Sequence, residues 1–425
     1  MKRTLLLFCI PLLFVPAMAQ LERSAAFQGK YQLSQVVVLS RHNIRSPLSG
    51  NGSALARITP HRWFGWSSPA SELSQRGGVL ETIMGQYFRK WLEAQGFFPE
   101  NYVPADGEVL LYANSMQRTI ATAQYFSAGF MPVANLPVRH TYAPSRMDSV
   151  FHPQLTKVSR KFRREALRQI GLMGGREGLQ GINKDLQPAY EILARVLDLR
   201  QSPACTQGDT CGFRLDDLCI ILEKGNEPRM GGSLKLANQA ADALILQYYE
   251  EPDTLKAAFG HDISRSQWEQ IARIKDVYGD VLFAAPIVAA NVAHPLLQEM
   301  LKELQQPGRK FTFLCGHDSN IASVNAALGV ADYQLPHAIE KKTPIGCKLV
   351  LEKWADRSGG LYAALNLVYQ SPDQLRQATL LGLAVPPVVF SLQLSGLTAN
   401  ADGLYPLEDV VGRFRQAIQA YDEIP

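Results

Sequence analysis

An unbroken apolar run, VVVL at residues 36–39, leads straight into the polar segment SRHNIRSP at residues 40–47. β-Branched residues in such a run predict a strand buried on both faces, and therefore a sheet with helices on either side. A loop that leaves such a strand is where open α/β sheets place ligand chemistry. In this loop Arg41 and Arg45 offer forked donors that suit a tetrahedral oxyanion such as phosphate, and His42 lies between them as a nucleophile.

Two later strands end in residues of the same kind. The run FTFLC at residues 311–315 is followed by a glycine, His317 and Asp318, and then by helical spacing; a helix that starts there favours an anion. The run VLLYA at residues 109–113 enters a turn and a helix that carries Arg118. Each residue alone has an ordinary explanation: a helix N-cap for Asp318, a satisfied core position for His317 and a surface charge for Arg118. Three strands that all end this way predict one shared site.

The rest of the chain predicts an α/β fold: a central mixed, mostly parallel sheet flanked by helices, with a mostly helical inserted cap domain. Apolar residues recur at three and four positions from Gly78 to Gln95, which predicts a helix with one buried face. Residues 349–354 and 363–369 predict paired strands across a Ser-Gly-Gly turn. Weak strand signals and several helical stretches mark the middle of the chain as the cap. The predicted domains are the cap at residues 145–260 and an α/β catalytic domain at residues 20–144 and 261–425.

Residues 1–19 have the features of a secretory signal peptide. Lys2 and Arg3 give a positive start, an apolar stretch follows, and Ala17-Met18-Ala19 is a cleavage site of the A-x-A kind. The stretch is short and contains two prolines, which disfavours an uncleaved membrane span. Cleavage would change the formal net charge from +4 to about +2. We therefore expect a periplasmic protein with neither nucleic-acid nor membrane partners.

Removal of Cys9 with the leader leaves five of the six cysteines, and an oxidising compartment permits disulfides. Cys205 and Cys211 lie close together in a loop that contains proline and glycine, and they are the predicted pair, with Cys219 as a rival partner for either. Cys315 lies in a predicted core strand, where a reduced thiol is an ordinary small hydrophobe. The cysteine spacing does not predict a zinc site, since no C-x-x-C pair or histidine partner is in range.

The RHxxRxP motif at residues 41–47 and the later His-Asp pair resemble the histidine acid phosphatases, branch 2 of the histidine phosphatase superfamily. The resemblance covers nearly the whole mature chain and is strongest with the bacterial periplasmic glucose-1-phosphatases. Most of the family has glycine after the histidine, whereas this chain has Asn43, as the glucose-1-phosphatases do. The resemblance implies a phosphoglycerate-mutase-like fold and a phosphoric monoester hydrolase. The matching segments are residues 40–48, 77–85, 112–126, 316–323, 343–346 and 368–376.

The same resemblance implies a role for each candidate residue. His42 takes the phosphoryl group as a phosphohistidine, and Asp318 protonates the leaving oxygen and then helps water attack. Three guanidiniums supply positive charge and keep a nearby imidazole unprotonated. We expect activity without a metal or cofactor and with an acidic optimum, since Asp318 has to carry a proton in the first step. The implied phosphate ligands are Arg41, Arg45, Arg118 and His317.

Substrate choice is less constrained by the sequence. Glu227 falls where the glucose-1-phosphatases carry a glutamate near the sugar, and there it would accept hydroxyl hydrogen bonds and repel phytate; a solvated loop carboxylate is the alternative. Asn43 either contacts the sugar or tolerates a left-handed backbone position. We expect small phosphate esters as partners, and hydrolysis of sugar phosphates, chiefly glucose 1-phosphate. A broad acid phosphatase or phytase is the first alternative, and a non-catalytic protein that binds phosphate esters is the second. The pattern does not predict an oligomeric state.

Overall fold

The structure of the protein is a computed structural model that describes residues 21, 23–48 and 54–425. Its strands are β1 (Tyr31–Arg41), β2 (Val109–Ala113), β3 (Val138–Arg139), β4 (Cys219–Ile221), β5 (Arg229–Gly231), β6 (Phe311–Gly316), β7 (Lys348–Asp356), β8 (Leu361–Tyr369), β9 (Val388–Ser391) and β10 (Tyr405–Pro406). Its helices are α1 (Ala25–Gln28), α2 (Ala54–Arg57), α3 (Gln75–Ala94), α4 (Gln117–Phe130), α5 (Arg160–Leu172), η1 (Gly175–Glu177), α6 (Leu179–Asp185), α7 (Gln187–Val196), η2 (Leu199–Gln201), α8 (Pro203–Thr206), α9 (Ser233–Glu250), α10 (Thr254–Ala257), α11 (Arg265–Phe283), α12 (Pro286–Val292), α13 (His294–Gln305), α14 (Asp318–Ala327), α15 (Pro372–Gln377) and α16 (Leu407–Gln419).

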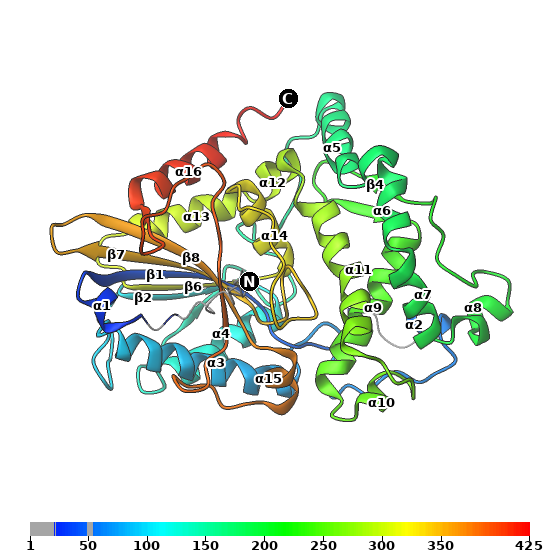
Figure 1. Cartoon of the computed structure of the whole chain (residues 1–425), viewed down its shortest axis with the longest axis horizontal. Helices are drawn as coiled ribbons and strands as arrows, with labels where there is room; N and C mark the ends of the chain where they lie inside the picture. The colour runs from blue at the N-terminus through cyan, green and yellow to red at the C-terminus, as the bar shows by residue number, and fades with distance from the viewer. Residues whose placement is uncertain (1–20, 22, 49–53) are drawn as a thin grey trace, which may run out of the picture.

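The described strands other than β4 and β5 form one eight-stranded mixed sheet, on the left in Figure 1. Its order is β10-β8-β7-β1-β6-β2-β3, and β9 pairs with β8. Strands β1, β6, β2 and β3 are parallel neighbours, while β7, β8, β9 and β10 join through antiparallel pairs. The prediction of a mixed, mostly parallel sheet flanked by helices is confirmed, and so is the predicted hairpin, which is β7 and β8.

Strand β1 lies at the centre of the sheet because its side chains are apolar on both faces. Val36 and Val38 pack in a buried cluster with residues of α3 and α4, such as Phe88 and Phe126. Val37 and Leu39 pack on the opposite face in a second cluster, which α13, α14 and α16 complete. The predicted burial of this strand on both sides is therefore confirmed, and Figure 1 shows α3 and α4 below the sheet with α13 and α16 above it.

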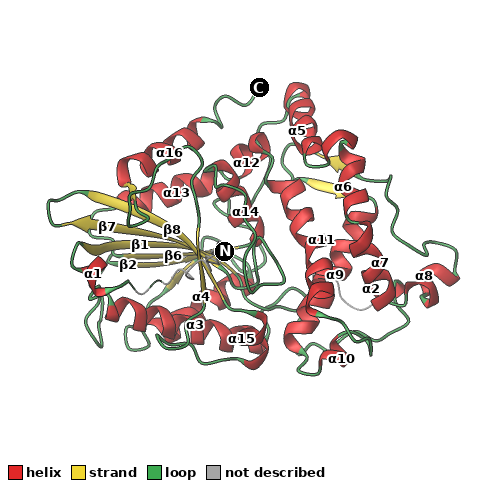
Figure 2. Cartoon of the chain, in the orientation of Figure 1, coloured by secondary structure: helices red, strands yellow, loops and turns green. Residues whose placement is uncertain are grey.

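Helices α5 to α11 form a mostly helical part beside the sheet, coloured red on the right of Figure 2. They share a third buried cluster to which α7, α9 and α11 contribute, and only the short pair β4 and β5 interrupts them in the described chain. The predicted disulfide joins Cys205 to Cys211, so the alternative pairing with Cys219 is wrong: that residue is free and exposed. The cap limits at residues 145 and 260 stay a prediction.

The predicted signal peptide, residues 1–19, lies outside the described residues. Among the residues described, no helix combines the length and the apolar character that crossing a bilayer requires.

Helices α3 and α4 cross in close contact through glycine. A Cβ atom on Gly85 would lie 2.1 Å from the carbonyl oxygen of Phe126, and one on Gly129 would lie 2.0 Å from that of Thr82. Such distances are far inside van der Waals contact, so any larger residue separates the two helices. The contact matters for the site because Arg118 is the second residue of α4, so the packing of this helix on α3 helps to position it.

We predict that Gly129→Ala lowers the free energy of unfolding by about 1–3 kcal/mol, because the added methyl group overpacks the α3–α4 contact. The matched control is Gly412→Ala on the exposed side of α16, where an added Cβ has no neighbour within 4 Å. There the change is expected to raise stability by about 0.5–1 kcal/mol, since alanine loses less backbone entropy in a helix. Urea denaturation measures both, and equal effects of the two changes would contradict the close packing.

Candidate functional site

Three parallel strands bring the predicted residues to one edge of the sheet. The register pairs Arg41 at the end of β1 with Gly316 at the end of β6, and Ala113 of β2 with Cys315. Carboxyl ends of parallel neighbours lie at the same edge, so the residues that follow each strand meet there. The structure brings the three segments together at this edge, as the sequence predicts.

His42 is buried, and backbone hydrogen bonds fix its place. Its N–H donates to the carbonyl of Gly316, and its own carbonyl accepts from the N–H of Gly346. The ring Nδ1–H donates to the Asn43 carbonyl at 2.9 Å, which leaves the Nε2 lone pair free to attack. Burial, followed by the positive charges of Arg118 and Arg45, holds the pKa of His42 well below its ordinary value. The imidazole is therefore unprotonated and nucleophilic.

The three predicted arginines line the same cavity as His42, which has a volume of about 360 Å³. In Arg41, Arg45 and Arg118 alike, the Nε atom is buried without a hydrogen-bond partner in the described structure. Arg118 also has no carboxylate within ion-pair distance among the described residues, and burial together with Arg45 lowers its pKa to about 10. An oxyanion bound in the cavity would accept hydrogen bonds from these unpaired guanidinium donors.

A chain of buried ion pairs holds two of these arginines in place. Glu340 Oε1 lies 3.0 Å from Arg41 Nη1 and 3.1 Å from Lys275 Nζ. Lys275 Nζ lies 2.8 Å from Asp242 Oδ1, and Asp242 Oδ2 lies 3.0 Å from Arg45 Nη2. Burial opposes ionisation of Glu340 and Asp242, but their cationic partners hold the pKa of both carboxyls below the usual range. The chain links β1 and its loop to α9 and α11 in the helical part.

His317 and Asp318 lie at the start of α14 and line the same cavity. The His42 and His317 rings meet edge to face with centroids 5.4 Å apart, and the Asn114 amide donates to His317 Nε2 at 2.7 Å. Partial burial would raise the pKa of Asp318, but Arg41, whose Nη2 lies 3.2 Å from Asp318 Oδ2, holds it below the ordinary value. The Asp318 side chain lines the cavity and is 48% exposed.

Glu227 lines the cavity, and its Oε1 lies 3.3 Å from His152 Nε2. The lining described here carries seven basic and six acidic side chains. Burial raises the pKa of Asp276 to about 7 and that of Asp280 to about 6, so the cavity becomes more positive as the pH falls. The basic side chains are Arg41, Arg45, Arg118, Arg229, Lys235, Lys275 and Lys342, and the acidic ones are Glu227, Asp242, Asp276, Asp280, Asp318 and Glu340.

Asn43 is the one predicted site residue that the structure does not bring to the cavity. Its amide nitrogen donates to Glu81 Oε1 at 2.8 Å, and its amide oxygen accepts from the N–H of Ile44. Glu81 pairs in turn with Lys348 at 3.0 Å, and both side chains are fully buried. A left-handed backbone is not the reason for asparagine either, since its φ is not positive. The residue instead ties the catalytic loop to a buried ion pair behind it.

Five charged residues around the site were not predicted from the sequence: Glu340, Asp242, Lys275, Glu81 and Lys348. Asp242 had a signal, because it interrupts the apolar pattern of α9 with a charge on a side that packs inward. Lys348 had another signal, as a charged residue directly before the apolar run LVL at residues 349–351.

Comparison with known proteins agrees with this geometry. A family model, described as histidine phosphatase superfamily (branch 2), matches residues 32–162. The glucose-1-phosphatase of Salmonella typhimurium is 40% identical over 382 residues, which are 89% of this chain and 91% of that protein.

The chain belongs to branch 2 of the histidine phosphatase superfamily.

A second relative, the glucose-1-phosphatase of Providencia rettgeri, is 36% identical over 96% of this chain and 97% of its own. Among solved structures, the apo form of Hafnia alvei phytase superposes with a TM-score of 0.84 at 27% identity, over 92% of this chain and 98% of that one. This histidine phosphatase is therefore a phosphoric monoester hydrolase of the histidine acid phosphatase type, with the fold that its relatives share.

We predict that Arg118→Gln moves the acid limb of the kcat/KM profile to higher pH and lowers the plateau about 10²-fold to 10³-fold. The sign follows from His42, which has to be unprotonated to attack: the Arg118 charge lowers its pKa, so removing that charge lets a proton bind at higher pH. Arg229→Gln is the matched control, since Arg229 lines the same cavity but pairs with Glu223. An acid limb that stays in place in Arg118→Gln would argue against this electrostatic role.

Proposed function

We propose that this histidine acid phosphatase hydrolyses sugar phosphates, with glucose 1-phosphate as its preferred substrate, through a phosphohistidine on His42. The observation that carries the proposal is the free Nε2 of a buried, unprotonated His42 beside three guanidiniums with unpaired Nε–H groups. The two relatives at 36% and 40% identity, both glucose-1-phosphatases, support the choice of substrate.

In the first step His42 Nε2 attacks phosphorus, and the bond from phosphorus to the ester oxygen breaks. Arg41, Arg45 and Arg118 hold the non-bridging oxygens, with His317 as a further donor, and offset the charge that spreads over them. Asp318 gives its proton to the leaving oxygen, so the sugar departs as a neutral alcohol.

In the second step water attacks the phosphohistidine. Asp318, now a carboxylate, accepts a proton from that water, the N–P bond breaks, and inorganic phosphate leaves. This step returns to Asp318 the proton that it gave up in the first step, and it leaves His42 Nε2 free. Splitting hydrolysis in this way replaces one difficult displacement by two easier ones.

The charge state of Asp318 links the mechanism to pH. In the ligand-free protein Arg41 favours the Asp318 carboxylate. A bound phosphate dianion engages that guanidinium and places negative charge near Asp318, which raises its pKa and favours the protonated acid. His42 resists protonation at the same pH because its own pKa is depressed. An acidic optimum follows from these two opposite shifts.

Charge balance in the cavity supports a monophosphate over phytate. Near neutral pH the seven basic side chains face six acidic ones, so there is little excess positive charge for an ester that carries six phosphates; the excess grows at lower pH as Asp276 and Asp280 take up protons. Glu227, which lines the same cavity, would accept hydrogen bonds from sugar hydroxyls and repel a second phosphate. The alternative is a broad acid phosphatase or phytase, which the structural likeness to Hafnia alvei phytase favours.

The N-terminal residues 1–19 support export to the periplasm, with cleavage after Ala19. The disulfide between Cys205 and Cys211 fits an oxidising compartment. We infer that residues 20–425 act there as the mature enzyme, with the predicted cap at residues 145–260, together with α11, over the cavity.

We predict that the ratio of kcat/KM for glucose 1-phosphate to kcat/KM for phytate exceeds one and rises from pH 5 to pH 7. The rise follows because Asp276 and Asp280 are protonated at pH 5 and become anionic as the pH approaches 7, which adds negative charge to the cavity. Glu227→Gln should lower the ratio several-fold, whereas Glu177→Gln, a surface residue paired with Lys184, should not. A strong preference for phytate at both pH values would reject the proposed substrate.

We also predict that Asp318→Asn slows turnover about 10²-fold to 10⁴-fold for glucose 1-phosphate, whose leaving oxygen needs a proton. The loss should be much smaller for p-nitrophenyl phosphate, because that leaving group departs as a stable anion. Steady-state assays of both esters at one pH measure the difference. Equal slowing of the two esters would count against Asp318 as the proton donor.

A further inference from the structure

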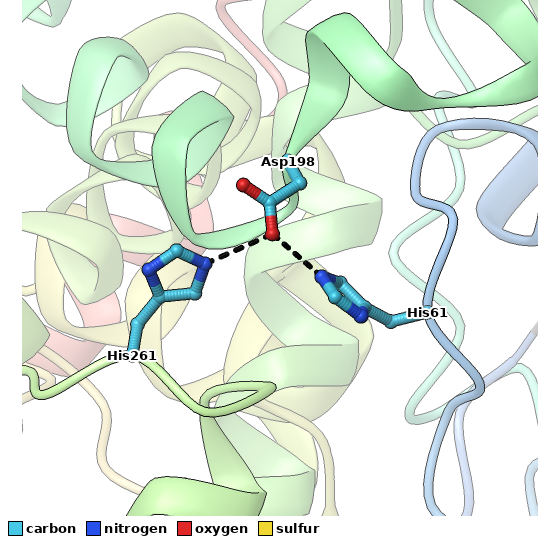
Figure 3. Close-up of side chains that lie close together, drawn as sticks. All are labelled: His61, Asp198 and His261. Carbon is cyan, nitrogen blue, oxygen red and sulfur yellow. Dashed lines mark hydrogen bonds and ion pairs between the residues drawn. The ribbon is translucent and has the colours of Figure 1, made fainter.

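A second group of chemically capable side chains lies away from the catalytic cavity. His61, Asp198 and His261 converge from three distant segments: the loop after α2, the junction of α7 and η2, and the loop between α10 and α11 (Figure 3). His61 Nε2 lies 2.6 Å and His261 Nε2 lies 3.1 Å from the same atom, Asp198 Oδ2. One ligand atom from each residue lies within 4.8 Å of the others, and no other described residues form such a group.

The surrounding structure fixes these three side chains. The His61 ring stacks on Phe259 with centroids 5.0 Å apart and planes 13° from parallel, and Phe259 packs edge-on against Trp63. The backbone N–H of Asp198 donates to the Arg195 carbonyl, and its own carbonyl accepts from the N–H of Gln201. The donors are therefore positioned by the fold.

We propose that His61, Asp198 and His261 bind a divalent transition-metal cation of the zinc class. Imidazole nitrogen and carboxylate oxygen are ligands that Zn²⁺ favours, whereas Ca²⁺ and Mg²⁺ select oxygen donors. Ligand atoms of a tetrahedral zinc ion at about 2.0–2.1 Å lie about 3.4 Å apart, so a small rearrangement of this group accommodates the ion.

Ligand charge and access are consistent with this cation. Each imidazole binds through Nε2 when its proton moves to Nδ1, and the Asp198 carboxylate supplies one negative charge. The side chains are 25–32% exposed, which lets an ion enter from solvent and leaves room for water as a fourth ligand. Both histidines already point their Nε2 atoms at the carboxylate, which is the orientation that a shared ion requires.

The site is structural because none of the three residues lines the catalytic cavity. A bound ion would join the segment before α3 to two parts of the helical cap that lie more than 60 residues apart in the chain. Binding to the folded state alone stabilises that state by mass action. The proposal stands apart from the phosphatase mechanism, so either can fail without the other.

The test uses the full-length protein, stripped of metal with a chelator and then titrated with Zn²⁺ at neutral pH. We expect one Zn²⁺ per chain by calorimetry, a higher Tm on binding, and tetrahedral Co²⁺ absorption bands when Co²⁺ replaces it. The double variant His61→Gln/His261→Gln keeps side-chain amide donors but should lose this stoichiometric binding. Asp198→Asn should weaken the affinity at least tenfold.

The matched control is His140→Gln, because His140 is exposed and bonds only to the Tyr142 carbonyl among the contacts described. It should bind Zn²⁺ as the unaltered protein does, and phosphatase activity reports that every variant is folded. The proposal would be overturned if the unaltered protein bound no Zn²⁺, or if the double variant were active and still bound Zn²⁺. In either case the three residues form only a hydrogen-bonded cluster.

Discussion

The structure depends on holding three guanidiniums around one neutral imidazole. Like charges repel, and burial in a cavity strengthens that repulsion, so the arrangement needs carboxylates that offset it. Glu340 and Asp242 do this for Arg41 and Arg45, with Lys275 between them. Arg118 has no such partner among the described residues, which leaves its charge for the phosphate and for lowering the pKa of His42.

This electrostatic arrangement joins the two parts of the molecule. Arg41 ends β1 and Arg45 lies in the loop after it, whereas Asp242 and Lys275 belong to α9 and α11 in the helical part. The helical part therefore orients these two arginines. The loop that carries His42 is fixed separately, because Asn43 bonds to Glu81, which pairs with Lys348 of the sheet. Contacts with α3 and the sheet therefore hold the nucleophile, whereas contacts with the helical part hold these two arginines.

Sequence alone predicted the sheet, its buried central strand and the meeting of His42, Arg118 and Asp318, because each follows a local rule: an apolar run, its end, and a polar residue beyond it. The carboxylate partners escaped prediction since they pair across long separations, 197 residues for Arg45 with Asp242 and 299 for Arg41 with Glu340. The prediction that Asn43 contacts the sugar failed for a related reason. Its neighbours in the chain line the cavity, but its side chain bonds to Glu81, which lies in α3. The pair Cys205 and Cys211 was predictable because it is local.

The most direct test of the central claim is a rapid acid quench with ³²P-labelled glucose 1-phosphate, followed by peptide mapping. The account predicts label on His42, its loss in His42→Ala, and its retention on His42 in His317→Ala at a slower rate. Turnover without any protein-bound label, or label on another residue, would contradict it.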